Sequence, residues 1–328
     1  MSAATPVAIA AESPHTVEAG RMVAEMGGSA VDIAVGAALA ATVSESLMCS
    51  LGGSAFINVK LPGGAPQLFD GADVMPPVPA AELADSERHW QVATIPYGDG
   101  ITVNVGHQSV AVPGMLRALE LAWQRHGSLP WAQVVEPAIA FARSGVTVNH
   151  TLVKWLGMAG RAVFYDQPDS REAFFPDGTN PLQHGDTFHP PHLADSLEQV
   201  ARHGADALYH GDLGRAFAEE ICSHGGYVTR EALAAYRAEI REPIVLESHG
   251  FQLALNPPPS IGGAMVGSMV QMYDTLWSPG MSEAERVLLL ARIQRAMFSL
   301  RHSEGGGNWD RQRADQILER EWLSRFFH

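Results

Sequence analysis

Gly27-Gly-Ser-Ala-Val-Asp-Ile-Ala34 opens the most apolar segment of the chain, which continues to Val43. Ser29 and Asp32 have the spacing of a capping box, in which two side chains satisfy the free N–H groups at the start of a helix. This spacing predicts a helix over residues 30–43. Its side chains are mostly alanine and valine, so neighbouring elements can approach its backbone closely. We therefore expect the helix to be buried.

The segments outside this helix predict short strands as well as further helices. Val7–Ala10 has the pattern of a short strand. Phe56–Val59 and Gln67–Phe69 flank Pro62-Gly-Gly64, which predicts a hairpin. Because strands and helices do not alternate regularly along the chain, the pattern favours an α+β layered fold over a doubly wound sheet.

Proline and glycine mark where the predicted helices and strands are interrupted. Residues 76–104 are rich in proline and are expected to form an irregular surface segment. Pro137 lies inside the helical pattern that follows Pro130 and is expected to kink or divide that helix. The C-terminal part of the chain has a helical pattern with a break at Gly305-Gly-Gly307.

The overall composition limits the classes of partner. Charged residues make up 18% of the 328 residues, which is below the ~25% typical of soluble domains. Part of the surface is therefore expected to be covered by a partner chain. The net charge of −14 argues against nucleic acid and anionic membrane as partners, because the summed field repels both.

Cysteine use and the N-terminal residues bear on the compartment. Cys49 and Cys222 form neither a disulfide framework nor a metal pattern, which fits a reducing compartment. Residues 1–6 lack the basic segment and the apolar run of a targeting signal. Residues 30–43 are too few to span ~30 Å of hydrocarbon. We expect a soluble, cytoplasmic protein that makes no membrane contact.

No motif supplies a recognisable nucleophile, metal site or cofactor site. Gly52-Gly53 and Gly262-Gly263 lack both the P-loop lysine and the dinucleotide fingerprint. His189 and His192 are separated by two prolines, without a carboxylate or cysteine at ligand spacing, so no metal and no cofactor are predicted. A Gly-x-Ser-x-Gly elbow is also missing. His107 could serve as a base, although a lone loop histidine is more often a local hydrogen-bonding residue.

A set of short segments, each weak alone, follows a specific order along most of the chain. They are Ala10-Ala-Glu-Ser-Pro-His15, Gly27-Gly-Ser-Ala-Val-Asp-Ile-Ala34, Ser50-Leu-Gly-Gly-Ser-Ala-Phe56, Val112-Pro-Gly114, His126-Gly-Ser-Leu-Pro-Trp131, Gly225-Gly-Tyr-Val-Thr229, Arg241-Glu-Pro243 and Pro257-Pro-Pro-Ser-Ile-Gly-Gly263. Together they resemble the large subunit of the gamma-glutamyltranspeptidases. In the third segment, Ser50 and Ser54 replace two glycines of the family pattern.

This resemblance implies an αββα four-layer sandwich of the N-terminal-nucleophile hydrolase type. Residues 1–328 would form one structural unit with a small subunit that is cut from the same precursor by autoprocessing. The first residue of that small subunit would be a threonine whose hydroxyl attacks a carbonyl, with its own α-amine as the base. No catalytic residue is then expected on this chain, which would end at His328 as a mature large subunit. Whether one or two heterodimers assemble stays open, so a heterotetramer is among the expected assemblies.

The segment Asp70-Gly-Ala-Asp-Val-Met-Pro76 departs from the family pattern Asp-x-Arg-Glu-x-Ala-Pro. The resemblance gives that arginine the role of gripping the α-carboxylate of a γ-glutamyl group, and Ala72 stands in its place. A methyl group cannot replace a bidentate guanidinium–carboxylate bond. The expected small-molecule substrate is therefore not glutathione. The resemblance to family members that lost this grip implies instead an amide, or a compound cleaved at a carbon–carbon bond next to a keto or enol acid, as in natural-product biosynthesis.

Two other interpretations stay open. The protein could be an ordinary γ-glutamyl hydrolase or transferase in which a nearby arginine takes over. It could also be a non-catalytic binding or assembly subunit that has kept the fold. The predicted substrate-facing positions on this chain are Asp70, Ala72, Asp73 and His107.

Overall fold

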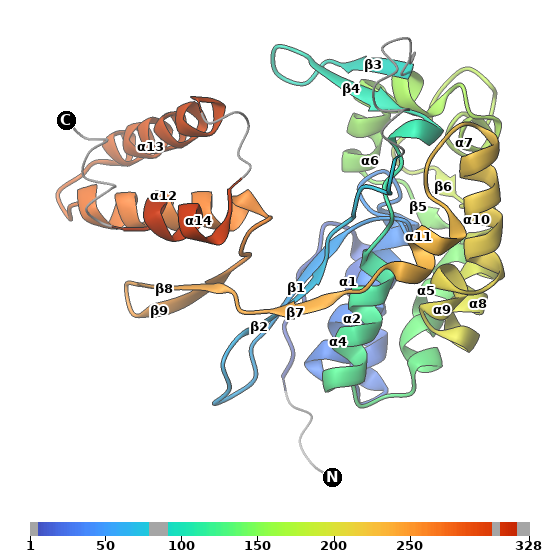
Figure 1. Cartoon of the computed structure of the whole chain (residues 1–328), viewed down its shortest axis with the longest axis horizontal. Coiled ribbons are helices and arrows are strands. Elements are labelled where there is room, and N and C mark those ends of the chain that lie inside the picture. The colour runs from blue at the N-terminus through green and yellow to red at the C-terminus, as the bar shows by residue number, and fades with distance from the viewer. Residues whose placement is uncertain (1–5, 79–90, 304–308, 320–328) are drawn as a thin grey trace. The chain divides into compact units, whose positions relative to one another are not determined.

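Helices and short strands form two units in a computed structural model that describes residues 6–78, 91–303 and 309–319. Unit 1 comprises Met1–Ala55 and Gly71–Glu239, and unit 2 comprises Phe56–Asp70 and Ile240–His328. The chain therefore enters unit 2 at residue 56, returns to unit 1 at residue 71, and forms the rest of unit 2 from residue 240 onward. Figure 1 shows the elements of both units.

Unit 1 is mainly helical. Its longer helices are α1 (Pro14–Glu25), α2 (Ala30–Ser44), α4 (Met115–His126), α5 (Trp131–Ser144), α6 (His150–Trp155), α7 (Pro168–Phe174), α8 (Leu193–His203), α10 (Asp212–Ser223) and α11 (Arg230–Ala235). Shorter or wider helical segments are η1 (His107–Ser109), the π-helical η2 (Leu156–Phe164) and α9 (Asp206–Tyr209). A small antiparallel pair joins β5 (Val146–Thr147) to β6 (Thr187–Phe188).

Helix α2 forms the centre of unit 1 and packs against α1, α4 and α5. At its start, the Ser29 N–H donates to Asp32 Oδ2 at 2.8 Å, and the Asp32 N–H donates to Ser29 Oγ at 3.2 Å. The predicted capping box and buried helix are confirmed. A Cβ atom at Gly36 would lie 2.7 Å from Val23 Cγ2 of α1. The small side chains of α2 therefore permit the close approach that its composition predicts.

Asp32 also fixes the connection between α4 and α5. Its buried carboxylate accepts hydrogen bonds from the Ser128 N–H at 2.9 Å, the Ser128 hydroxyl at 2.7 Å and the Leu129 N–H at 3.3 Å. Burial acts to raise the pKa of the Asp32 carboxyl. The hydrogen bonds from Ser128 and Ser29 outweigh burial and hold this pKa below its ordinary value. A negative charge is thus stabilised inside the helical core.

Pro137 does not divide its helix, because α5 runs without interruption from Trp131 to Ser144. The apolar stripe of α5 is buried, and the Trp131 indole N–H donates to the Val200 carbonyl of α8 at 2.8 Å. This packing outweighs the loss of the intrahelical hydrogen bond that proline cannot donate.

Two other expectations for unit 1 are wrong. Val7–Ala10 belongs to no strand, and Ile9 instead packs against α1, where a Cβ atom at Gly20 would lie 3.1 Å from Ile9 Cδ1. Residues 76–104 are not irregular throughout, since β3 (Gln91–Ile95) and β4 (Ile101–Val105) form an antiparallel hairpin. Alternating β-branched residues in these strands outweigh the proline signal. Residues 79–90 lie outside the described part of the chain.

The hairpin strands predicted around residues 56–69 are confirmed. They are β1 (Ala55–Val59) and β2 (Gln67–Gly71), which form a sheet with β7 (Glu239–Arg241) in the order β1-β2-β7. Apart from terminal residues, this sheet belongs to unit 2. A second hairpin of unit 2 pairs β8 (Ile244–Ser248) with β9 (Phe251–Leu255).

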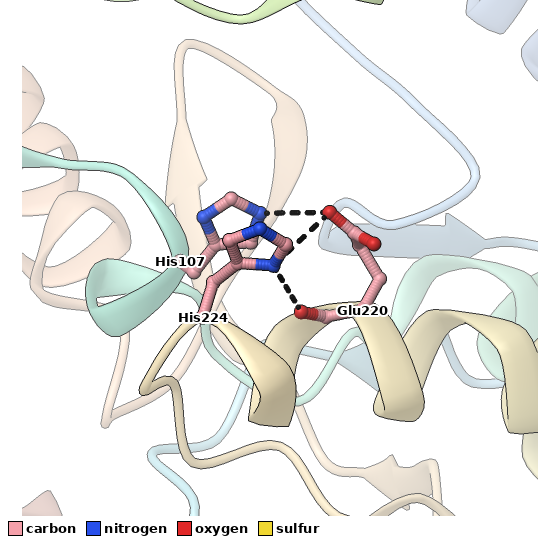
Figure 2. Close-up of side chains that lie close together, drawn as sticks. All are labelled: His107, Glu220 and His224. Carbon is pink, nitrogen blue, oxygen red and sulfur yellow. Dashed lines mark hydrogen bonds and ion pairs between the residues drawn. The ribbon is translucent and has the colours of Figure 1, made fainter.

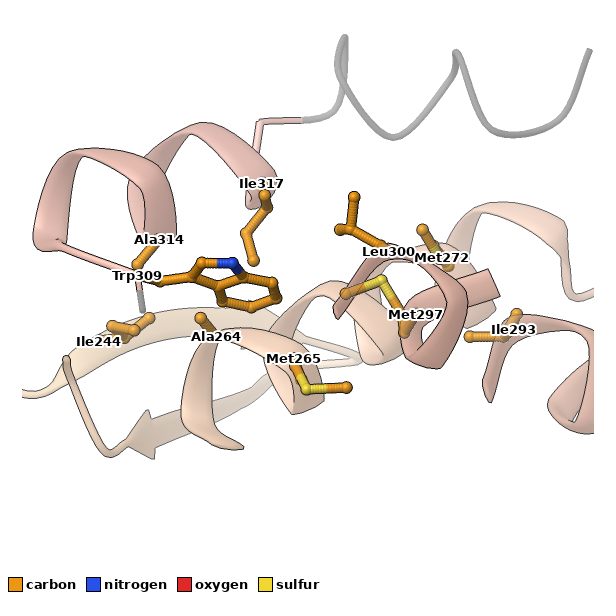
Figure 3. Close-up of a cluster of buried hydrophobic side chains, with 10 residues drawn as sticks. All are labelled: Ile244, Ala264, Met265, Met272, Ile293, Met297, Leu300, Trp309, Ala314 and Ile317. Atoms are coloured by element: carbon orange, nitrogen blue, oxygen red, sulfur yellow. The ribbon is translucent and has the colours of Figure 1, made fainter. Parts of the chain in front are cut away.

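Unit 2 has its own apolar core, which lies among α12 (Ile261–Leu276), α13 (Glu283–Ser303), α14 (Arg311–Ile317) and the β8–β9 hairpin. Its buried side chains, drawn in Figure 3, are Ile244, Ala264, Met265, Met272, Ile293, Met297, Leu300, Trp309, Ala314 and Ile317. The C-terminal helical pattern is therefore confirmed. The predicted break at Gly305-Gly-Gly307 lies outside the described residues.

Helices and short sheets without regular alternation confirm the α+β prediction. Among the described residues, none of the helices has the length and apolar character needed to cross a membrane. The expectation that residues 1–328 form one structural unit with a small subunit stays a prediction.

Candidate functional site

Two of the ordered sequence segments meet at the start of α4. The Gly53 carbonyl accepts hydrogen bonds from the Gly114 N–H at 3.0 Å and from the Met115 N–H at 2.9 Å. These N–H groups belong to the first turn of α4, which has no intrahelical acceptors for them. The loop of residues 50–54 therefore caps α4 through its backbone.

The segment after Asp70 joins the same place through a short backbone bridge. Val74 and Val112 exchange N–H···O hydrogen bonds of 3.1 and 2.8 Å. Residues 50–54, 71–76 and 112–115 thus lie together, and we call them the motif junction.

Two glycines permit this close approach. A Cβ atom at Gly71 would lie 2.5 Å from the Ala118 Cβ and 2.7 Å from the Gly114 carbonyl oxygen. A Cβ atom at Gly114 would lie only 2.2 Å from the Tyr236 hydroxyl. Real Cβ atoms do not approach other heavy atoms so closely, because the interior is already close-packed. Glycine is therefore required at both positions.

Ala72 is held in the motif junction by its backbone. The Tyr236 hydroxyl donates a 2.7 Å hydrogen bond to the Ala72 carbonyl. The Tyr236 ring stacks on Tyr209 with centroids 5.6 Å apart, and the Tyr209 hydroxyl donates to the Pro113 carbonyl at 2.8 Å. Burial, with a smaller effect of Tyr236, raises the pKa of Tyr209. Two stacked tyrosines thus fix the backbone on both sides of the junction.

Asp73 is exposed and is tied to Ser54 in both directions. The Ser54 hydroxyl donates to Asp73 Oδ1, and the Asp73 N–H donates to Ser54 Oγ at 3.2 Å. The next two side chains, Val74 and Met75, are 52% and 65% exposed. The edge of the junction beside half-buried Ala72 therefore combines one carboxylate with two open apolar side chains.

Asp70 lies in unit 2 and has a structural partner there. Its carboxylate is 5% exposed, and its Oδ2 atom lies 2.7 Å from the Nε of Arg241, which is 36% exposed. Both residues belong to the β1-β2-β7 sheet, Asp70 in β2 and Arg241 in β7. The ion pair compensates the charge of a buried carboxylate, which is costly to bury alone.

His107 lies in unit 1, next to two residues that the sequence analysis did not single out (Figure 2). Its Nε2 atom is 3.3 Å from Oε1 of Glu220, and its ring stacks on His224 with centroids 4.3 Å apart. A cavity of about 650 Å³ lies beside them. Glu220 and His224 are more than 110 positions from His107 in the sequence, so no local spacing could indicate this cluster.

The predicted substrate-facing residues thus fall into three places. Ala72 and Asp73 lie in the motif junction, whereas Asp70 is engaged by Arg241 in the unit 2 sheet. The described lining of the cavity beside His107 includes none of these three residues. Tyr236 and Ser54 are further contact residues of the junction. Ser54 falls in the third ordered segment, Ser50–Phe56, which is the signal by which it could have been found.

Comparison with known proteins decides the family. A model of the gamma-glutamyltranspeptidase family matches residues 16–325. The chain belongs to the gamma-glutamyltranspeptidase family. Among curated members, it is 29% identical to the glutathione hydrolase proenzyme of Escherichia coli (strain K12), over 89% of this chain and 49% of that protein. It is 32% identical to the acylase ACY 1 proenzyme of Pseudomonas sp. (strain SE83), over 87% of this chain and 51% of that protein.

A solved structure of the gamma-glutamyltranspeptidase family supports the fold. It is the gamma-glutamyltranspeptidase from Pseudomonas nitroreducens complexed with L-DON, with a TM-score of 0.80 and 24% identity. The match covers 98% of this chain and 93% of that chain. This likeness confirms the predicted fold type. The present gamma-glutamyltranspeptidase-family chain spans about half the length of the curated relatives that it matches.

Proposed function

We propose that this chain is the large subunit of a gamma-glutamyltranspeptidase-family hydrolase and works with a small subunit from the same precursor. In this proposal, Oγ of an N-terminal threonine on the small subunit bonds to the carbonyl carbon of the substrate. The threonine α-amine takes the Oγ proton and passes it to the leaving group as that group's bond to carbon breaks. Water then hydrolyses the acyl-enzyme. No residue of the present chain takes part in these bond changes.

The exposed apolar side chains of unit 2 support a partner chain. On the β8–β9 hairpin and α13, Phe251 is 74% exposed, Val287 60% and Phe298 55%. With Leu288 and Leu290, α13 carries four large exposed apolar side chains, and groups of such side chains, unlike single ones, are typical of interaction surfaces. The occupant we propose is the small subunit, since the relatives are about twice as long and their other half supplies a chain of sufficient size.

We further propose that the substrate lacks the α-carboxylate of a γ-glutamyl group. The observation that carries this proposal is Ala72, whose side chain has no charge to offer at the position of the family's arginine. Arg241 already faces the buried Asp70 carboxylate, which argues against its taking over that role. The exposed Val74 and Met75 give the adjoining edge an apolar character.

These features favour an acyl group without an α-carboxylate over glutathione. The resemblance to family members that lack the arginine adds amides of small acids, and compounds with a carbon–carbon bond next to a keto or enol acid, as the candidate substrates. The relative named as an acylase supports an acyl-transfer chemistry that is not limited to γ-glutamyl compounds. An ordinary γ-glutamyl hydrolase or transferase and a non-catalytic assembly subunit are the competing functions.

A matched set of three p-nitroanilides tests the substrate proposal with the complete two-chain protein. The γ-glutamyl compound carries both α-substituents, the 4-aminobutyryl compound lacks only the carboxylate, and the glutaryl compound lacks only the amine. We expect removal of the carboxylate to change kcat/KM by less than about threefold. An ordinary member of the family would lose roughly tenfold to a hundredfold, because a charge-assisted hydrogen bond to the carboxylate contributes about 1.5–3 kcal/mol.

The first residue of the small chain tests the class of function. Mass spectrometry of the complex is expected to find threonine there, produced by cleavage of one precursor. A small chain that began with a residue other than Thr, Ser or Cys would favour a non-catalytic subunit. A strong preference for the γ-glutamyl anilide would instead favour an ordinary γ-glutamyl enzyme.

A further inference from the structure

Three side chains with metal-binding donor atoms converge at the end of α10. His107, Glu220 and His224 each offer one ligand atom, and these three atoms all lie within 4.8 Å of one another. Oε1 of Glu220 is 3.3 Å from His107 Nε2. The His224 ring is held beside the same oxygen by its Nδ1 atom, which lies 3.3 Å away and is not the nitrogen that faces the ion. Figure 2 shows both imidazole rings on the same side of the carboxylate.

The backbone brings these residues together in a defined way. Glu220 and His224 are four residues apart at the end of α10, so their side chains share one face. Gly225, with φ of +78°, turns the chain back, and a Cβ atom at Gly226 would lie 2.4 Å from the His107 carbonyl oxygen. Glycine at position 226 therefore lets the end of α10 pack directly against the His107 backbone.

The distances suit a four-coordinate ion. Donor atoms that lie 2.0–2.1 Å from a tetrahedral zinc ion are roughly 3.3 Å apart, as Glu220 Oε1 and His107 Nε2 are. His224 Nδ1 lies 3.0 Å from the Glu220 carbonyl oxygen. When Nδ1 donates its proton to that carbonyl, Nε2 keeps a lone pair for the ion. A backbone carbonyl that fixes the tautomer in this way is a common support of ligating histidines.

The surroundings favour a cation. The adjoining cavity is also lined by Asp166 and Asp169, and no lysine or arginine is among its described lining residues. The chain as a whole carries a net charge of −14, which raises the local concentration of cations. His107 is 19% exposed, whereas Glu220 and His224 are 61% and 54% exposed, so an ion can enter from solvent.

We propose that His107, Glu220 and His224 bind one divalent transition-metal ion of the zinc type. Two imidazoles and one carboxylate are a ligand set that suits Zn²⁺. Three protein ligands leave a fourth position open toward the cavity, where water or a small anionic ligand can bind. This site goes beyond the hydrolase activity proposed above and does not depend on it. It departs from the expectation of a metal-free chain, which rested on the spacing of histidines in the sequence.

Zinc titration of the complete protein tests the site. After treatment with a chelator, the protein is titrated with Zn²⁺ against a zinc-binding dye, and its melting temperature is recorded with and without Zn²⁺. We expect one equivalent to bind per copy of this chain and to raise the melting temperature, because an ion that binds only the folded state stabilises it. Co²⁺ in place of Zn²⁺ should give the visible absorption of a tetrahedral ion.

A matched pair of double variants separates this site from general surface binding. Glu220→Gln with His224→Gln removes two ligands from exposed positions, and Glu219→Gln with His203→Gln makes the same chemical changes outside the cluster. The first variant should bind Zn²⁺ at least about tenfold more weakly, while the second keeps full affinity and the Co²⁺ spectrum. Equal affinity in the two variants, or no stoichiometric binding to the unmodified protein, would overturn the proposal.

Discussion

The Nε atom of Arg241 lies 2.7 Å from Oδ2 of Asp70, joining the C-terminal end of β2 to β7 within unit 2. Asp70 is the penultimate residue of β2 (Gln67–Gly71), so this ion pair fixes the end of that strand. Arg241 opens one of the ordered family segments, Arg241-Glu-Pro243, and it supports a buried carboxylate. The ion pair therefore stabilises unit 2, and it keeps Arg241 engaged with Asp70.

Replacing Arg241 should destabilise unit 2. In Arg241→Gln the buried Asp70 carboxylate loses its charged partner, and we expect a loss of about 2–4 kcal/mol. Urea unfolding of the complete protein measures this loss. Arg311→Gln is the matched control, because Arg311 pairs with Asp315 at 2.9 Å on the exposed surface of α14. It should cost less than about 1 kcal/mol, and similar losses in both variants would contradict a supporting role of Arg241.

Replacing the Tyr236 hydroxyl should affect the motif junction more than the fold. Tyr236→Phe removes the 2.7 Å hydrogen bond to the Ala72 carbonyl and should cost about 1 kcal/mol of stability. Because this bond positions Ala72, we also expect kcat/KM to fall for the protein's preferred anilide. Tyr165→Phe removes a hydroxyl that donates to the Gly178 carbonyl at 2.6 Å, a contact outside the junction. Steady-state kinetics should find this control unchanged.

Restoring the missing guanidinium should shift substrate preference. Ala72 is half-buried at the edge of the junction, so Ala72→Arg can place its charge at solvent. We expect kcat/KM for γ-glutamyl p-nitroanilide to rise roughly tenfold or more relative to the 4-aminobutyryl compound. Ala132→Arg adds the same charge at an exposed position on α5 and should leave the ratio unaltered. An unchanged ratio in Ala72→Arg would show that position 72 does not face the acyl group.

Stability in acid should depend on Asp32. The pKa of the Asp32 carboxyl is lower in the folded chain than in the unfolded chain. Its contribution to the free energy of unfolding is therefore complete above about pH 4, the ordinary pKa of an aspartate. Below that pH the unfolded chain takes up the proton first, and the contribution is lost as pH falls through the folded pKa.

Asp32→Asn should therefore be less stable by about 2–4 kcal/mol at pH 7 and should decline less steeply between pH 4 and pH 2. Unfolding by urea over a pH series measures both effects. Asp99→Asn, at an exposed loop position, provides the control and should match the unmodified protein. A parallel decline in Asp32→Asn and the unmodified protein would rule out this role of Asp32.

Features that depend on neighbouring residues or on motif order can be predicted from the amino-acid sequence. The Ser29–Asp32 capping box spans three positions, and a helix start needs nothing else to form it. The replacement of the family's arginine by Ala72 is likewise visible in a single short segment. Motif order over most of the chain was enough for the family and the fold type.

Contacts between side chains that are distant in the sequence become visible only in the folded chain. Pairing of Asp70 with Arg241 spans 171 positions (241 − 70), and the His107–Glu220 contact spans 113 (220 − 107). Such contacts depend on how β2, β7, η1 and α10 pack, which residue spacing does not encode. The same holds for Val7–Ala10, which belongs to no strand and of which Ile9 packs on α1. The packing of whole elements against one another decides which distant residues meet, and local spacing carries no record of it. For that physical reason the cluster at His107 could not be foreseen.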